Sequence, residues 1–492
     1  MSQISVQNLT FGYDGGYTNV FEDVSFCIDT EWKLGLVGRN GRGKTTFLNL
    51  LLGKLQYTGK ISSSVKFSYF PYAVKDINRL SYDIVSDICP NAEDWEIIRE
   101  LSYLNVDAEA LYRPFSTLSN GERTKVLLAG LFLNEGDFLL IDEPTNHLDT
   151  AARQIVAEYL KRKKGFILVS HDRAFLDGCV DHILSINRAD IEVQSGNFSS
   201  WFENFQRWQA FEAAQNEKLK KDISRLSEAA KRTAEWSDKT EESKFGKTSS
   251  GLKPDRGFVG RKAAKIMKRA KSAEARSQQA IEQKSALLKN AETYEKLKLF
   301  PLEYRSEKLV SFNKVQILYG GNAVCDGLTF DILKGERIVL QGKNGCGKSS
   351  VLKLLAGKDI SFCGTLYKSS DIKISYLPQT TEGVKGNLRD FAIENGIDES
   401  LFKAILNKMD FDKKDFDADI SSFSEGQKKK TLIAKSLCQS AHLYIWDEPL
   451  NYIDIYSRIQ IENLIKEFKP TMIFAEHDKA FQLSVATKFI SM

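Results

Sequence analysis

The 492-residue chain contains no hydrophobic run long enough to cross a bilayer. Its longest apolar stretches, such as Val126 to Leu133, are much shorter than the roughly 20 residues that a transmembrane helix needs. The N-terminus, MSQISVQNLTFGYDGG, has neither the basic start nor the apolar run of a secretion signal. We therefore expect a cytoplasmic protein with no membrane part.

Cysteine and histidine are also scarce. The chain has 7 cysteines and 5 histidines, all widely spaced and without a CxxC pair. An odd number of scattered cysteines argues against a disulfide framework, a zinc site and an iron–sulfur cluster. The composition, 42% hydrophobic and 27% charged, is that of an ordinary globular protein. Because single cores stop growing at roughly 250–300 residues, we expect two or three domains.

The chain does contain an internal repeat, in which four motifs recur in the same order about 305 residues apart. The pairs are GRNGRGKT (38–45) with GKNGCGKS (342–349), LSNGE (118–122) with FSEGQ (423–427), LLIDEPTNHLD (139–149) with YIWDEPLNYID (444–454), and SHD (170–172) with EHD (476–478). Constant order and spacing indicate a duplicated domain. Short apolar runs such as LGLV and FLLID alternate with helical patterns in both copies but not between them. This predicts two tandem α/β domains with parallel strands, over residues 1–200 and 301–492.

The intervening segment, residues 201–300, is predicted to be helical. Apolar residues between Trp201 and Thr240 are separated by three, four or sums of these numbers, as on one face of a helix. After GKTSSGLKPDRGFVG interrupts the pattern, Ile266, Ala273, Ala280 and Leu287 follow seven apart. We therefore predict two long helices folded back as an antiparallel hairpin.

Positive charge is concentrated on the outer part of this segment. Residues 231–290 hold 16 Lys and Arg against 7 Asp and Glu, and Arg261 to Lys271 contains no acid. Such a patch is typical of contact with nucleic acid. A solvated helical face is the alternative interpretation.

Both copies of GxxxxGK[ST] fit a phosphate-binding loop between a strand and a helix. The glycines let backbone N–H groups surround phosphate oxygens, and the helix N-terminus adds its positive dipole. Lys44 and Lys348 would reach the outer phosphates, while Thr45 and Ser349 would offer hydroxyls to Mg²⁺. The candidate ATP-binding residues of the two loops are Gly38, Asn40, Gly41, Gly43, Lys44, Thr45, Thr46, Gly342, Asn344, Gly345, Gly347, Lys348, Ser349 and Ser350.

Each copy also ends an apolar strand with two acids. Asp142 and Asp447 stand where parallel sheets place metal-facing carboxylates. Glu143 and Glu448 follow them and are candidates to polarise the attacking water. An ordinary helix-start acid after a strand is the alternative.

Taken together, these motifs resemble the nucleotide-binding domains of the ATP-binding cassette (ABC) superfamily. In that family LSNGE and FSEGQ correspond to the signature that closes over the ATP held by the other domain, which implies a monomer with a head-to-tail intramolecular sandwich. The resemblance implies ATP contacts from Ser119, Gly121, Glu122, Ser424, Gly426 and Gln427, and γ-phosphate contacts from His171 and His477. Asp149 and Asp454 would end the loops that link the two sites.

The resemblance further implies adenine stacking by Tyr13 and Tyr319, for which a core aromatic is the alternative. Gln379, in SYLPQ, stands at the family's Mg²⁺-sensing glutamine, but the first copy has Tyr72 there. A phenol lacks the carbonyl acceptor of an amide. We therefore expect the two sites to hydrolyse ATP at unequal rates.

Two cassettes with a basic hairpin between them and DEPTNHLD in the first copy resemble the ABC-F family. This resemblance implies a ribosome partner, with contacts to large-subunit rRNA and to exit-site and peptidyl-site tRNA. Within it, EPLNYID and GLVGRNGRGKTT resemble the antibiotic-resistance branch of Lsa and Vga type, and the spacing from phosphate loop to signature, about 75 residues in both copies, leaves no room for an extra arm. That branch protects ribosomes from lincosamide, streptogramin A and pleuromutilin drugs.

A hairpin tip near the drug site would use Phe245, Leu252, Phe258, Lys262, Lys265, Lys268 and Arg269. Packing of the three apolar residues against the opposite helix is the alternative. The competing functions are a housekeeping ABC-F translation factor, the ATPase subunit of a drug efflux transporter, and a DNA-repair ATPase.

Overall fold

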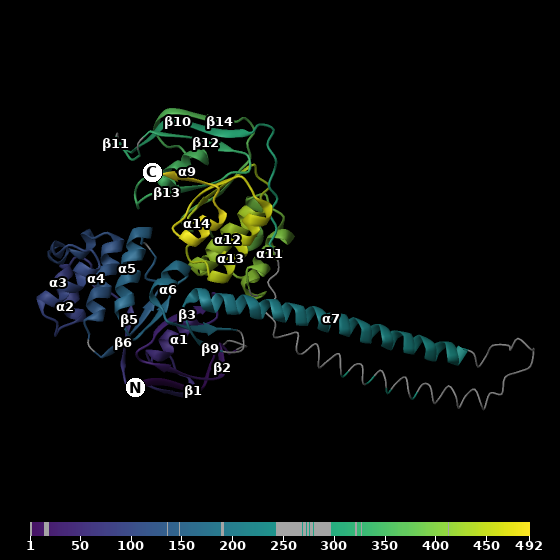
Figure 1. Cartoon of the computed structure of the whole chain (residues 1–492). Coiled ribbons are helices and arrows are strands. Elements are labelled where there is room, and N and C mark those ends of the chain that lie inside the picture. The colour runs from purple at the N-terminus through teal and green to yellow at the C-terminus, as the bar shows by residue number, and fades with distance from the viewer. Residues whose placement is uncertain are drawn as a thin grey trace, which may run out of the picture. The chain divides into compact units, whose positions relative to one another are not determined.

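A computed structural model of the whole chain (Figure 1) describes residues 2–13, 19–134, 136–146, 148–187, 191–242, 268, 272, 275, 279, 297–319, 322–325, 327–411 and 413–492. By internal contacts the chain divides into one unit, Met1–Trp201 with Tyr294–Met492, and a second unit, Phe202–Thr293. The first unit contains both copies of the repeat. No helix within the described residues is long and apolar enough to span a membrane.

The first copy is built on a six-stranded sheet in the order β5-β6-β7-β3-β8-β9, in which only the β8 and β9 pair is antiparallel. A smaller antiparallel sheet has the order β2-β1-β4. The strands are β1 (Gln3–Phe11), β2 (Phe21–Asp29), β3 (Lys33–Gly38), β4 (Thr58–Ser62), β5 (Lys66–Phe70), β6 (Asp137–Asp142), β7 (Phe166–Val169), β8 (His182–Ile186) and β9 (Ile191–Ser195). The helices are α1 (Lys44–Leu51), α2 (Ser81–Ile88), α3 (Asp94–Tyr103), η1 (Ala108–Tyr112), η2 (Phe115–Thr117), α4 (Asn120–Phe132), α5 (Thr150–Arg162) and α6 (Arg173–Cys179).

The second copy repeats this plan with a parallel five-stranded sheet, β15-β16-β17-β13-β18, and a smaller antiparallel sheet of β11, β10, β12 and β14. Its strands are β10 (Lys308–Tyr319), β11 (Asn322–Ala323), β12 (Leu328–Leu333), β13 (Arg337–Gln341), β14 (Phe362–Lys368), β15 (Ile374–Leu377), β16 (Leu443–Asp447), β17 (Met472–Ala475) and β18 (Lys488–Ser491). Its helices are α9 (Lys348–Leu355), α10 (Leu388–Glu394), α11 (Glu399–Lys408), η3 (Lys413–Asp417), η4 (Ile420–Ser422), α12 (Glu425–Cys438), α13 (Ile455–Phe468) and α14 (Lys479–Val485). The expected pair of α/β domains with parallel strands is confirmed.

The central parallel strands owe their position to continuous apolar runs. Leu34 and Leu36 of β3, Leu140 of β6 and Ile167 of β7 are all at most 1% exposed. Strands buried on both faces need such runs instead of alternation. The carboxyl ends of these strands therefore carry the first polar residues, and those residues meet at one edge of the sheet.

The first of the two predicted linker helices is present as α7 (Phe198–Glu242), which has 45 residues. At 1.5 Å per residue it is roughly 67 Å long. Of the second predicted helix, only Lys268, Ser272, Ala275 and Gln279 belong to the described residues, and all four are helical. The antiparallel hairpin stays a prediction.

Candidate functional site

The first phosphate loop lies between β3 and α1 and depends on two left-handed glycines. Gly41 has φ 79° and Gly43 has φ 92°, a region that side chains with a Cβ rarely adopt. A Cβ on Gly43 would also lie 2.5 Å from Cγ1 of Val20, so a larger residue here would force its neighbours to shift. The loop turns back on Lys44, whose Nζ donates to the carbonyls of Gly38 (2.7 Å) and Arg39 (3.1 Å).

The second phosphate loop, between β13 and α9, repeats this geometry. Gly345 and Gly347 have φ 82° and 98°. Lys348 Nζ donates to the carbonyls of Gly342 (2.8 Å) and Lys343 (3.0 Å). Both lysines are buried at the N-terminus of a helix, where the helix dipole adds to their charge. Each loop therefore presents an ammonium group and backbone N–H groups, which together suit a polyphosphate.

A hydroxyl and a carboxylate meet beside each loop. Thr45 Oγ1 donates to Asp142 Oδ2 (3.2 Å), and Ser349 Oγ donates to Asp447 Oδ1 (3.0 Å). The other oxygen of Asp447 is buried and has no hydrogen-bond partner among the described residues, and burial raises the pKa of this carboxyl to about 6. Mg²⁺ typically binds one or two protein oxygens together with phosphates and water. The pair of oxygens therefore fits a nucleotide-bound Mg²⁺.

A glutamate and a histidine face each other next to each carboxylate. His171 Nε2 lies 3.3 Å from Glu143 Oε1, and His477 Nε2 lies 3.6 Å from Glu448 Oε1. Both glutamates have positive φ, 50° and 46°, which is strained for a residue with a side chain. Backbone hydrogen bonds hold them at the neighbouring strand, from Glu143 N to Val169 O and from Glu448 N to Ala475 O, both 2.9 Å.

The two glutamates have opposite pKa shifts. Burial and the adjacent charge of Asp142 raise the pKa of Glu143 to about 8. Burial would also raise the pKa of Glu448, but hydrogen bonds from His477, Gln379 and Asn451 together with the charge of His477 outweigh it and lower the pKa to about 2. At neutral pH the second glutamate is therefore ionised and the first is mostly protonated.

Each signature motif starts a helix through a capping box. Ser119 Oγ accepts from Glu122 N (3.2 Å), while Glu122 Oε2 accepts from Ser119 N (2.8 Å), at the start of α4. Ser424 and Gln427 do the same at the start of α12. The capping box satisfies two backbone groups and fixes the entry of the chain into the helix. Gly121 and Gly426 occupy the first turns of these helices, and a Cβ on Gly426 would lie 2.8 Å from Tyr452 O and 2.9 Å from Asn40 Nδ2.

The motifs of the two copies face each other across the first unit. A cavity of about 1310 Å³ is lined by the second phosphate loop together with the first signature, and Gln379, Glu448 and His477 also line it. The lining residues from these two motifs are Ser119, Asn120, Gly121, Glu122, Lys343, Asn344, Gly345, Gly347, Lys348, Ser349 and Ser350. The first loop touches the second copy directly, because Asn40 Nδ2 donates to Tyr452 O (2.9 Å) and lies beside Gly426.

The remaining expected residues are only partly described. Tyr13 is 53% exposed, and its hydroxyl lies 2.8 Å from Oγ1 of Thr46. Tyr319 ends β10, but its side chain lies outside the described part of the chain. Tyr72 is 36% exposed and lines a separate hollow beside β5. Of the expected tip residues, Lys268 is helical and exposed, whereas Phe245, Leu252, Phe258, Lys262, Lys265 and Arg269 lie outside the described residues.

Two functional contacts were not predicted from the sequence. Asn451 Nδ2 donates to Glu448 Oε2 (2.6 Å), and Lys429 Nζ donates to the carbonyls of Pro378 (2.9 Å) and Gln379 (3.1 Å). Asn451 lies three residues after Glu448 in the motif YIWDEPLNYID, so its contact with this glutamate could have been predicted from the sequence. Lys429 is fully buried, and only the fold shows that it reaches the loop carrying Gln379.

A sequence model of the family described as ABC transporter matches residues 21–146 and 325–451, together over half of the chain. The chain belongs to the ABC transporter family. Ribosome protection protein VmlR of Bacillus subtilis is 25% identical and aligns with 94% of this chain and 82% of its own length. Energy-dependent translational throttle protein EttA of Escherichia coli K12 is 26% identical, with 96% and 89% covered.

A solved structure also has a similar fold. An archaeal ribosome recycling factor, aABCE1, solved with the archaeal ribosomal stalk protein aP1, has a TM-score of 0.63 at 19% identity and covers 98% of this chain and 87% of its own. Family membership makes the chain an ATPase that uses ATP with Mg²⁺.

Proposed function

We propose that this ABC ATPase is an ABC-F protein that binds the ribosome when ATP holds its two halves together, and that it protects the ribosome from drugs of the peptidyl-transferase centre. The observation that carries the switch is the composite cavity, in which one phosphate loop and the opposite signature line the same space. A ligand that touches both halves favours the closed form through its differential binding.

At each site the phosphate-loop residues bind ATP, with Lys44 and Lys348 on the outer phosphates. Thr45 and Asp142 would hold Mg²⁺ at the first site, and Ser349, Asp447 and Gln379 would hold it at the second, where it would neutralise charge on the phosphates. Glu143 and Glu448 orient the attacking water and accept its proton. His171 and His477 contact the γ-phosphate, and Tyr13 and Tyr319 stack on adenine.

Hydrolysis is proposed to be faster at the second site. Glu448 is ionised at neutral pH and is oriented by Asn451, whereas Glu143 is mostly protonated. Gln379 lines the second cavity, and the corresponding Tyr72 is partly exposed beside a different hollow. Loss of the γ-phosphate removes contacts that bridge the halves, and the protein is released.

The root of the linker provides a route from the ATP sites to the partner. Trp201 is 4% exposed, and its ring packs edge-on against Tyr456 at 6.4 Å. Tyr456 lies on α13, whose N-terminal cap is Asp454 of the second NYID motif. A shift of this loop during closure therefore reaches the start of α7, beyond which residues 201–300 are proposed as the basic arm toward rRNA and tRNA.

Similarity to VmlR and EttA over nearly the whole chain supports a ribosome partner, as does the basic excess of residues 231–290. A monomeric, cytoplasmic protein is part of this proposal. The same similarity to EttA supports a second candidate, a housekeeping translation factor without drug specificity. An efflux subunit offers no role for the basic linker.

Ribosome co-sedimentation tests this proposal. The Glu143→Gln/Glu448→Gln protein should pellet with ribosomes in the presence of ATP, and the matched Lys44→Ala/Lys348→Ala protein should not. Soluble and membrane fractions of the same lysate are assayed in parallel. Recovery with membranes, or ribosome binding independent of ATP, contradicts the proposal.

Drug protection separates the two ribosomal candidates. Expression should raise the inhibitory concentration of lincosamide, streptogramin A or pleuromutilin drugs. Alanine at Phe245, Leu252 or Phe258 should abolish this protection for at least one position while ATPase activity and ribosome binding persist. Ribosome binding without protection from any of these drugs favours the housekeeping factor.

A further inference from the structure

The first phosphate loop is held to the second copy by an ion-pair cluster that we call the Asp410 pin, made of Arg39, Arg42 and Asp410. Asp410 Oδ1 lies 3.3 Å from Nη1 of Arg39, and Asp410 Oδ2 lies 3.3 Å from Nη2 of Arg42. The three side chains are only 10%, 24% and 15% exposed. Partly buried pairs are screened less by salt than surface pairs, so the cluster joins the halves more firmly than an exposed ion pair would.

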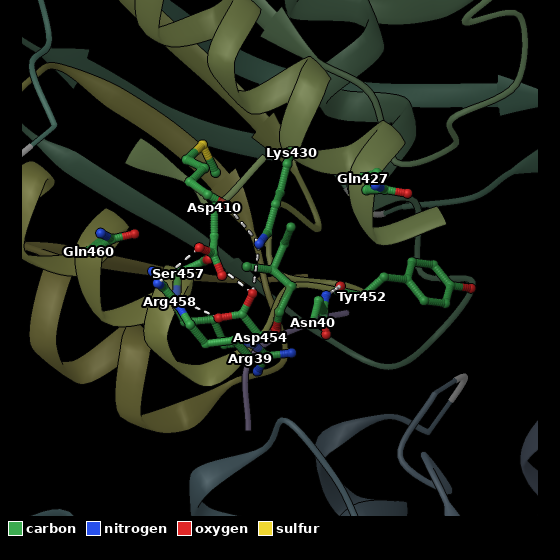
Figure 2. Close-up of polar contacts among 12 residues, drawn as sticks. Arg39, Asn40, Asp410, Gln427, Lys430, Tyr452, Asp454, Ser457, Arg458 and Gln460 are labelled. Atoms are coloured by element: carbon green, nitrogen blue, oxygen red, sulfur yellow. Dashed lines mark hydrogen bonds and ion pairs between the residues drawn. The ribbon is translucent and has the colours of Figure 1, made fainter. Parts of the chain in front are cut away.

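Asp410 is itself held in place by the second copy. It follows α11 in the left-handed region, at φ 69°, and the carbonyl of the preceding Met409 accepts from Lys430 Nζ (2.9 Å). The same ammonium pairs with Asp454 Oδ2 at 2.8 Å. Figure 2 shows this arrangement, with Arg39 and Asn40 of the first loop among Asp410, Lys430, Tyr452 and Asp454 of the second copy.

Within the described part of the chain, the pin is present at one of the two sites. In the repeat, Arg39 and Arg42 correspond to Lys343 and Cys346, and Asp410, two residues after α11, corresponds to Asn105, two residues after α3. Asn105 has the same left-handed backbone, φ 50°, but is exposed and uncharged. The backbone plan is therefore duplicated, while the charges that connect loop and opposite half are not.

The two interfaces differ accordingly. At the first site the phosphate loop contacts the opposite half, since Asn40 donates to Tyr452 O and lies beside Gly426 of the opposite signature. At the second site, a cavity of about 1310 Å³ lies between loop and signature.

We propose that Asp410 is a positioning residue for the first ATP site, which fixes Arg39 and Arg42 so that this site stays closed on its nucleotide while the second site opens and closes. The inference rests on the proposed assignment of the two phosphate loops. The apparent dissociation constant equals the intrinsic constant divided by the fraction of protein in the competent form, so loss of the pin weakens nucleotide binding at the first site.

The test uses 2′/3′-N-methylanthraniloyl-ATP and the purified full chain without ribosomes. In the Lys348→Ala protein, nucleotide binds mainly at the first site. In the Lys44→Ala protein, it binds mainly at the second site. Asp410→Asn, which introduces the residue of the first copy, should weaken binding about fivefold in the Lys348→Ala background, equivalent to about 1 kcal/mol. It should change binding less than twofold in the Lys44→Ala background.

Matched variants distinguish positioning from a general effect on folding. Asp410→Glu should restore most of the affinity. Arg42→Gln should reproduce the loss and be non-additive with Asp410→Asn. Arg173→Gln removes another ion pair between the halves, to Glu462 at 2.7 Å, and should affect both backgrounds alike.

Equal effects of Asp410→Asn in both backgrounds, or no effect in either, would overturn the pin and leave the loop assignment intact. If the Lys44→Ala and Lys348→Ala proteins each bind as much nucleotide as the unmodified chain, the loop assignment fails and the pin fails with it. A gain-of-function variant is a further test. Introducing the corresponding charges at the second site, with Asn105→Asp and Cys346→Arg, should tighten nucleotide binding there.

Discussion

Replacing Glu448 by Gln should remove most of the ATPase activity at pH 7, whereas replacing Glu143 should remove little. A carboxylate can accept a proton from water only when it is ionised. With a pKa of about 8, Glu143 is ionised in about one molecule in ten at pH 7, because one pKa unit is a tenfold change in the ratio. Glu448, with a pKa of about 2, is fully ionised.

The pH dependence of the two variants should therefore differ. The pKa of Glu143 is raised, so its active carboxylate form increases as pH rises. Activity that remains in the Glu448→Gln protein should increase about tenfold between pH 6 and 7 and level off above pH 8. In the Glu143→Gln protein the activity depends on Glu448, which stays ionised between pH 6 and 8. Titration of the catalytic glutamate should therefore not change this activity over that range.

Phosphate release under saturating ATP and Mg²⁺ measures both rates, with the Glu143→Gln/Glu448→Gln protein as baseline. The reasoning predicts a ratio of about ten between the single variants at pH 7. It is wrong if the two variants lose equal activity, or if the Glu448→Gln protein has a flat profile from pH 6 to 8.

Three further perturbations address parts of the site and the linker root. Gln379→Tyr removes a hydrogen bond to an ionised carboxylate, worth roughly 1.5–3 kcal/mol, and should lower phosphate release at the second site by at least tenfold; an unchanged rate with an unchanged Mg²⁺ requirement contradicts this role. Gly43→Ala should weaken nucleotide binding at the first site far more than Gly41→Ala, because only the former places a Cβ against Val20 and Phe21; equal effects in a binding titration contradict the geometry. Trp201→Ala should destabilise the first unit by about 3–5 kcal/mol and lower its unfolding temperature in calorimetry, whereas Trp208→Ala, at a 49% exposed position, should not.

The local parts of the site could be predicted from the sequence because short-range rules determine them. Gly41 and Gly43 precede a lysine at a helix start, and the same spacing in both copies matches the phosphate-loop motif. Ser119 with Glu122, three residues apart before an apolar run, is the sequence signature of a capping box, and the structure contains it. The acids after apolar strands likewise follow from the carboxyl edge of a parallel sheet.

Contacts between the halves could not be predicted in this way. Arg42 and Asp410 are 368 residues apart, and neither lies in a spacing that a local rule recognises. The sequence could not predict the opposite pKa shifts of Glu143 and Glu448 either, because the two residues occupy the same place in the repeat. Their difference comes from neighbours such as Gln379, which fold next to only one of them.

The differences between the two copies all concern the first ATP site. Tyr72 stands in place of the glutamine, Glu143 is partly buried and has a raised pKa, and Asp410 pairs with Arg39 and Arg42 of the first loop. We propose that the first two changes slow hydrolysis at that site and that the third keeps it closed. If the two copies had changed independently, these three differences would not need to occur at the same site. They would occur together if the first site holds the halves closed and the second hydrolyses ATP, because slow hydrolysis prolongs closure.

Faster hydrolysis at the first site, with the pin intact, should therefore shorten the lifetime of the closed form. The Tyr72→Gln/Glu448→Gln protein tests this prediction. Faster nucleotide release from that protein than from Glu448→Gln alone would support the division of labour, and an unchanged lifetime would contradict it.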